Sequence, residues 1–332
     1  MALDSRAAAN WQRWAANPHR NLKLIQMIRT VFLNNNHRLR SGWRILLQLV
    51  SFIILLVVVQ SFQDAAETQQ SLLIFLLSSV IYLIGIGGMV WAFARWIDRR
   101  QPVDYGFRLC REWWLDFGIG FLLGVVTLTV VFVTEWSMGW LQIPSVGQTI
   151  FEEPFVFVGI VTLLNLLAVA VGEEFTFRGY QIRNIAEGIS GEQRVTWAPI
   201  TALLVTAMFF GVLHMGNPNA TLMGGVNVVL AGLLLGLGYL LTGELALSIG
   251  LHLAWGYFEE FVYGFANSGQ IPSSRLIGSE VIGPELWTGG GFGPEAGILV
   301  TLLIMVNALL IIVWVKFRRR WQGIRAELAE YG

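Results

Sequence analysis

Long apolar stretches dominate the chain and alternate with short polar loops. Eight of them have close to the twenty or so residues that a helix needs to cross a membrane; they cover residues 44–62, 72–94, 117–136, 155–177, 197–213, 220–241, 245–264 and 296–315. Each stretch is continuously apolar, which argues against the short alternating strands of a membrane β-barrel. The pattern predicts an all-α fold, a polytopic membrane bundle of about eight transmembrane helices.

Composition agrees with this pattern. Of the residues, 55% are apolar and 13% are charged, and the mean hydropathy is +0.60; soluble domains carry about 25% charged residues. The formal net charge is zero, so nothing indicates a nucleic-acid partner. The single cysteine, Cys110, excludes a disulfide within this sequence and a multi-cysteine metal cluster.

Basic residues gather in alternate loops, and this sets the expected orientation. Loops 63–71 and 137–153 contain no Lys or Arg. The basic positions precede the first apolar stretch or follow the second, fourth and eighth: Arg38, Arg40, Arg44, Arg95, Arg99, Arg100, Arg108, Arg111, Arg178, Arg183, Arg194, Lys316, Arg318, Arg319, Arg320 and Arg325. The positive-inside rule then predicts both termini in the cytoplasm. We expect a multi-pass protein of a bacterial plasma (inner) membrane.

The apolar stretches and the loop charges together predict four parts of the chain. They are a cytoplasmic or interfacial segment at 1–43, two membrane helices at 44–100, a six-helix core at 101–317 and a cytoplasmic tail at 318–332. Segment 265–295 is rich in Gly, Pro and Ser. It is expected to be an external loop, either a lid over a site or a plain linker.

Ionisable side chains inside the membrane are costly and usually face a protein cavity. The fourth apolar stretch ends in such a group, with Glu173, Glu174 and Arg178. Glu174 and Arg178 are one helical turn apart, so they can pair, whereas Glu173 points about a quarter turn away and stays free as a general base. The alternative is a charged cluster at a helix end that reaches the cytosol.

Two histidines also lie in or directly after apolar stretches, His252 and His214. A lone histidine there is more often a packing residue. Glu259 is interpreted as a carboxylate at the membrane interface, and neither it nor Glu260 is assigned to the site. Together, however, Glu173, His214 and His252 have the parts for activating water. Either all three ligate a metal ion, with zinc as the candidate, or Glu173 takes a proton from a water held by His214 while His252 stabilises the oxyanion.

Three ordered motifs resemble one known family. Glu-Glu-x-x-x-Arg at 173–178, Phe-x-x-x-His at 210–214 and Ser-Ile-Gly-Leu-His at 248–252 are similar to motifs of the CAAX-protease and bacteriocin-processing (CPBP or ABI) family of intramembrane proteases. The likeness covers about 100–315 and includes the glycine-rich stretch 289–297. The resemblance implies these site residues: Glu173 as catalytic carboxylate, His214 and His252 as its partners in binding water or metal, and Phe210, Glu174 and Arg178 as supports.

One position departs from the family pattern. The family commonly has Asn four residues after the last histidine, where this chain has Gly256. Glycine offers no side-chain donor, and the loss of one oxyanion donor costs about a hundredfold or more in rate.

The resemblance thus implies an intramembrane endopeptidase acting near the cytoplasmic leaflet on a membrane-associated peptide or lipidated-protein substrate. The alternatives are a non-catalytic scaffold or immunity-type protein that keeps the protease fold, and a transporter or proton-coupled channel.

Overall fold

The computed structural model describes residue 26 and residues 29–190, 197–318 and 323–330. Most of the predicted interfacial segment 1–43 lies outside these residues. So do part of the predicted tail 318–332 and the basic positions Arg194, Arg319 and Arg320 that contributed to the expected orientation.

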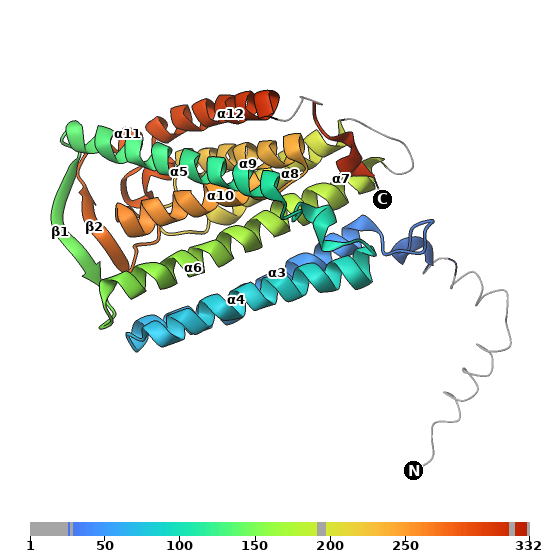
Figure 1. Ribbon diagram of the computed structural model, residues 1–332, viewed down its shortest axis with the longest axis horizontal. Coiled ribbons are helices and arrows are strands. Elements are labelled where there is room, and N and C mark those ends of the chain that lie inside the picture. Colours follow the sequence, from blue (N-terminus) through green and yellow to red (C-terminus); the bar gives the residue numbers. More distant parts are fainter. Residues whose placement is uncertain (1–25, 27–28, 191–196, 319–322, 331–332) are drawn as a thin grey trace, which may run out of the picture.

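All eight apolar stretches form helices, packed into one bundle (Figure 1). Six helical spans of the described chain are long and apolar enough to cross a membrane: Ser41–Thr68 (α3), Leu72–Asp98 (α4, Leu72–Ala92, extended by the π-helix Phe93–Asp98), Arg111–Ser137 (α5), Phe155–Ser190, Leu222–Thr242 (α9) and Ile298–Arg318 (α12). The fifth and seventh stretches form shorter helices, Ala198–His214 (α8) and Ala246–Gly256 (α10), and α10 continues as the π-helix Tyr257–Val262. The polytopic helical bundle is confirmed, whereas a count of eight spanning helices is not.

One end of the bundle carries an unpredicted two-stranded antiparallel sheet. Strand β1 (Leu141–Thr149) pairs with β2 (Ser274–Val281), so two loops far apart in sequence are joined. The register is irregular between Gln142 and Ser145, where Pro144 has no N–H to give to the ladder. We call this the sheet end. Short turns complete the fold: Pro102–Tyr105, Glu285–Thr288 (α11), Gly290–Phe292, Pro294–Ala296 and Ala326–Ala329.

The fourth apolar stretch is longer than its hydropathy indicated. The helix α6 (Phe155–Glu173) continues without a break through the π-helix Glu174–Ile182 into α7 (Arg183–Ser190), a span of 36 residues. Arg178 therefore lies inside the bundle, with 1% of its surface exposed. The alternative that placed this charged cluster at a cytoplasmic helix end is wrong, because the helix continues past it.

The opposite end is closed by buried ion pairs, and we call it the basic end. Glu187 on α7 accepts hydrogen bonds from Arg38, from Arg44 at 2.8 Å and from Arg100 at 2.7 Å. Arg44 also approaches Asp98 at 3.3 Å. Further donors to Asp98 are Tyr105, Tyr180 and Asn184. Arginines that the sequence analysis counted only as loop charges are thus part of the packed core.

Candidate active site

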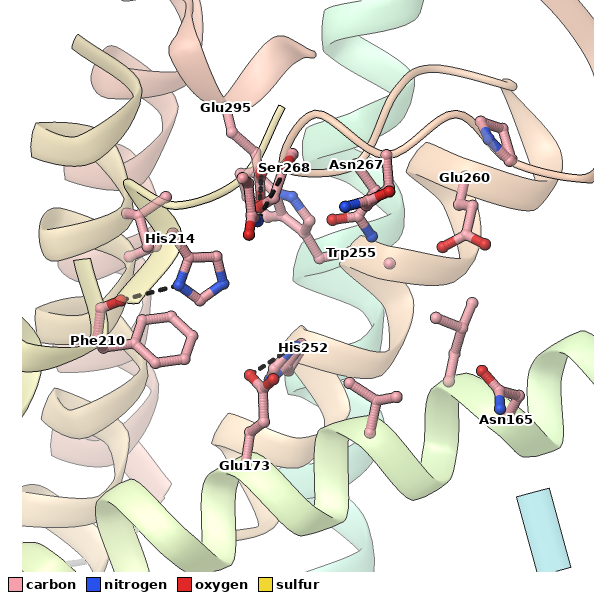
Figure 2. A pocket seen from close by; sticks show the side chains of 18 of the residues that line it. Asn165, Glu173, Phe210, His214, His252, Trp255, Glu260, Asn267, Ser268 and Glu295 are labelled. Atoms are coloured by element: carbon pink, nitrogen blue, oxygen red, sulfur yellow. Dashed lines mark hydrogen bonds and ion pairs between the residues drawn. The ribbon is translucent and has the colours of Figure 1, made fainter. Parts of the chain in front are cut away.

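A cavity of about 650 Å³ lies within the bundle and contains most of the predicted site. Its lining includes Glu173, Phe210, His214, His252 and Gly256, contributed by α6, α8 and α10 (Figure 2). From Glu173, midway along the long helix, the lining continues to the loop residues 270–273 at the sheet end. Ile271 in that loop is 77% exposed. The cavity therefore opens at the sheet end, away from the basic end.

Glu173 and His252 face each other at the base of this cavity. The distance from Glu173 Oε2 to His252 Nε2 is 3.9 Å, and about a fifth of each side chain is exposed. This separation is too long for a direct hydrogen bond. It does allow one water molecule to contact both atoms, which is the arrangement that a general base and its water require.

Glu174 lies behind His252 and fixes its ring. Its Oε1 atom accepts a hydrogen bond from His252 Nδ1 at 2.8 Å and another from Arg178 Nη1 at 2.9 Å. Glu174 is completely buried. Because Nδ1 donates to this carboxylate, the lone pair of the neutral ring is on Nε2, the atom that faces Glu173. The predicted Glu174–Arg178 pair is present, and it supports the histidine directly.

His214 lines the same cavity from the end of α8. Its Nδ1 lies 2.8 Å from the carbonyl oxygen of Phe210, and its ring packs on Phe210 with centroids 4.5 Å apart. A carbonyl can only accept, so Nδ1 carries the proton and Nε2 remains as an acceptor. Phe210 also packs under the Arg178 guanidinium, 4.7 Å from the ring centre. The predicted support role of Phe210 thus corresponds to contacts with two residues of the site.

The predicted metal ligands were Glu173, His214 and His252. Within the described ranges, no group of three His, Cys, Asp or Glu side chains is placed to hold a metal ion. The three residues share a cavity but do not form a three-ligand site in this conformation. Zinc therefore remains a prediction, and no step below depends on it.

The structure differs from the sequence analysis at two carboxylates: Glu259 was expected at the membrane interface, and Glu260 was not assigned to the site. Glu260 lines the cavity and Glu259 is completely buried. The reason is the π-helix Tyr257–Val262, which follows directly after α10. A π-helix has more residues per turn than an α-helix. This shift brings Glu260, rather than Glu259, toward the face that carries His252, and the α-helical phase used in the sequence analysis could not show it.

Asparagine side chains of the cavity were also missed by the sequence analysis. Asn165 on α6 and Asn267 in the loop after α10 both line it (Figure 2). Asn165 precedes Glu173 by two helical turns and could have been found from spacing. Asn267 is held by tertiary contacts of a loop, for which the sequence offers no periodic signal.

Comparison with known proteins gives relatives without an established activity. The chain is 26% identical to the uncharacterized protein YyaK of Bacillus subtilis over 216 residues, which cover 63% of this chain and 69% of YyaK. It is 31% and 30% identical to the probable transporter YedE of Salmonella typhimurium and of Escherichia coli, over 40% and 42% of this chain. These matches span 35% and 38% of the two transporters, little more than a third of their length. No solved structure matches the chain.

A protein-family model, by contrast, matches at the site. Residues 154–258 match the family described as type II CAAX prenyl endopeptidase Rce1-like. The matched segment contains Glu173, Glu174, Arg178, Phe210, His214, His252 and Gly256. Over this segment, the chain is confirmed as similar to the CAAX-type intramembrane proteases.

Proposed function

We propose that this protein is an intramembrane endopeptidase that hydrolyses a peptide bond in a membrane-associated peptide or lipidated-protein substrate. The observation that carries the proposal is the pair Glu173 and His252, 3.9 Å apart in a cavity open at one end. The buried Glu174–Arg178 pair behind His252 supports it, because it fixes the ring that faces Glu173.

The geometry supports the following reaction. A water molecule contacts Glu173 Oε2 and His252 Nε2, and Glu173 removes its proton as the oxygen attacks the substrate carbonyl carbon. The carbonyl π electrons move to the oxygen, which becomes an oxyanion. When the carbon–nitrogen bond breaks, the proton held by Glu173 passes to the leaving amine. His214 presents its free Nε2 to the same cavity as a further acceptor for water or substrate.

Activity is measured with a defined reporter panel in proteoliposomes. The panel contains a fluorescence-quenched farnesylated peptide with a CAAX end, the same peptide without the lipid, and a mixture of quenched peptides of varied sequence. If the wild-type protein cleaves none of these peptides, the proposed function is contradicted. Dialysis against a chelator, followed by zinc, separates direct water activation from a zinc mechanism through Glu173, His214 and His252.

Replacing His252 with asparagine tests the proposal directly. We expect reporter cleavage to fall by about 10²–10⁴-fold, the contribution of acid–base catalysis, because Glu173 can act only on a water that His252 holds beside it. The matched control is His37→Asn, which removes an exposed imidazole outside the cavity, at a positive φ that asparagine tolerates. If the His252 variant cleaves the panel as fast as the His37 variant, the water-activating pair is not Glu173 and His252.

The open end of the cavity near Ile271, its mouth, indicates from which side of the membrane a substrate would enter. The arginines of the basic end predict that end to be cytoplasmic, and the cavity opens at the sheet end. We therefore place substrate entry on the non-cytoplasmic side, in place of the cytoplasmic leaflet expected from the sequence.

Cysteine labelling in intact bacterial cells tests this orientation. Cys110 is exposed and precedes α5 at the basic end, whereas Ile271 is exposed at the mouth. A membrane-impermeant maleimide is expected to label Ile271→Cys in a Cys110→Ser background. It should label native Cys110 only after permeabilisation. The reverse pattern would place the cavity mouth in the cytoplasm.

Transport is the second candidate, because two relatives carry the name probable transporter. An open channel needs an opening at both ends of the bundle at once, whereas a transporter opens its ends in turn. At the basic end, Glu187 and Asp98 hold buried Arg44 between α3, α4 and α7. This closed end argues against an open channel, and cleavage of the reporter panel by purified protein separates hydrolysis from transport.

A further inference from the structure

Hydrolysis of a peptide bond creates negative charge on the carbonyl oxygen, and an efficient enzyme places a hydrogen-bond donor there. The position expected to provide one, four residues after His252, is Gly256. His252 Nδ1 is already committed to Glu174. A donor therefore has to come from another part of the cavity wall.

The wall carries neutral amides from Gln60, Gln63 and Gln270 and from four asparagines, and contacts distinguish the asparagines. Asn217 donates to the carbonyl of Ser268 at 3.0 Å. Asn227 donates to the carbonyls of Glu295 at 2.8 Å and Gly297 at 3.0 Å. Both amides therefore tie loops together. Asn165 and Asn267 also line the cavity, and Asn165 lies two turns before Glu173.

The amide of Asn267 lies beside the glycine. A Cβ built on Gly256 would be 3.7 Å from Asn267 Nδ2 and 3.5 Å from Leu166 Cδ2. Residues four apart on a helix have their Cβ atoms about 5–6 Å apart, so this amide lies about one turn from His252. Figure 2 shows Asn267 on the cavity wall between Trp255 and Glu260.

A tight turn fixes the backbone of Asn267. Asn267 and Gln270 exchange two backbone hydrogen bonds of 2.9 Å, and Ser268 and Gly269 between them both have positive φ. Gly269 N–H donates to the carbonyl of Phe292 at 2.8 Å, within the glycine-rich stretch 289–297. A side chain at Gly269 is excluded, because its Cβ would lie 1.9 Å from the Pro218 carbonyl oxygen.

We propose that Asn267 supplies the amide donor to the substrate oxyanion, in the place that Gly256 leaves open. The amide nitrogen carries two hydrogens. In this proposal one hydrogen goes to Glu260, its neighbour on the cavity wall (Figure 2), and the other goes to the substrate carbonyl. This inference rests on the proposed peptidase function. In this chain the donor comes from a loop after the helix, and the glycine-rich stretch holds that loop in position.

Moving the amide from the loop to the helix tests the proposal. Asn267→Ala is expected to lower kcat on the reporter panel by about 10²–10³-fold, with a smaller change in KM. Adding Gly256→Asn to this variant is expected to restore about tenfold or more of the lost rate, because the vacated space lies next to that Cβ. Gly256→Leu in the same background has a similar shape without donors, and it should restore nothing.

Two results would overturn the inference. One is an Asn267→Ala protein that keeps wild-type kcat. The other is a failure of Gly256→Asn to restore more activity than Gly256→Leu, whether both variants rescue equally or neither does. Either outcome would make the role of Asn267 structural. Thermal unfolding of each variant shows whether it is folded. The proposed function fails separately, if the wild-type protein is inactive on the panel or Glu173→Gln remains active.

Discussion

Replacing Glu173 with glutamine is expected to lower reporter cleavage by about 10⁴-fold, the upper end of the range for a general acid–base group. Glutamine has nearly the same shape, so it keeps the packing of the cavity. It cannot accept the proton of the attacking water or return it to the leaving amine. The measurement is kcat for the best peptide of the panel in proteoliposomes.

A matched variant separates this chemistry from a general effect of losing a carboxylate. Glu280→Gln removes an exposed carboxylate on β2, away from the cavity lining. It should cleave at the wild-type rate. Equal kcat for the Glu173 and Glu280 variants would show that Glu173 is not the base. The protein would then be better described as a scaffold that keeps the protease fold.

Glu187→Gln is expected to cost about 3–5 kcal/mol of folding free energy, the usual cost of breaking a buried ion pair. The carboxylate of Glu187 is shared by Arg38, Arg44 and Arg100, whose side chains are 1–3% exposed. A neutral amide cannot compensate three buried guanidinium groups. The free energy of unfolding is measured by denaturant titration in mixed micelles.

A surface pair provides the control for this loss. Glu327 pairs with Arg325, and 60% of the Glu327 side chain is exposed. Exposed ion pairs contribute about 0–1 kcal/mol, so Glu327→Gln should unfold almost like the wild type. If the Glu187 variant is equally stable, Asp98 and the surrounding carbonyls are enough to hold the three arginines.

Local periodicity accounts for what could be predicted from the sequence. The eight apolar stretches were located because a membrane helix has a minimum length and continuous hydropathy. The Glu174–Arg178 pair followed from a spacing of four residues, which makes neighbours on any α-helix. The order of the three motifs indicated the protease family, and the match over residues 154–258 agrees with it.

What could not be predicted depends on contacts between distant segments. The hydrogen bond from His252 to Glu174 joins residues 78 positions apart, so hydropathy does not reveal it. The same is true of the β1–β2 sheet and of the turn that presents Asn267. The arginines of the basic end have two roles. Their use as a predictor of topology needs only the sequence, whereas their burial against Glu187 depends on tertiary contacts.

For the proposed hydrolysis, the closed basic end would also determine where the water comes from. The cavity lining lies in the middle of the bundle and toward the sheet end, and the ion pairs of Glu187 and Asp98 fill the other end. Each water molecule consumed, and each proton exchanged with solvent, therefore passes through one aqueous compartment. In an energised cell the two compartments differ in pH. The rate of cleavage should then depend on the pH at the cavity mouth and not on the pH on the other side of the membrane.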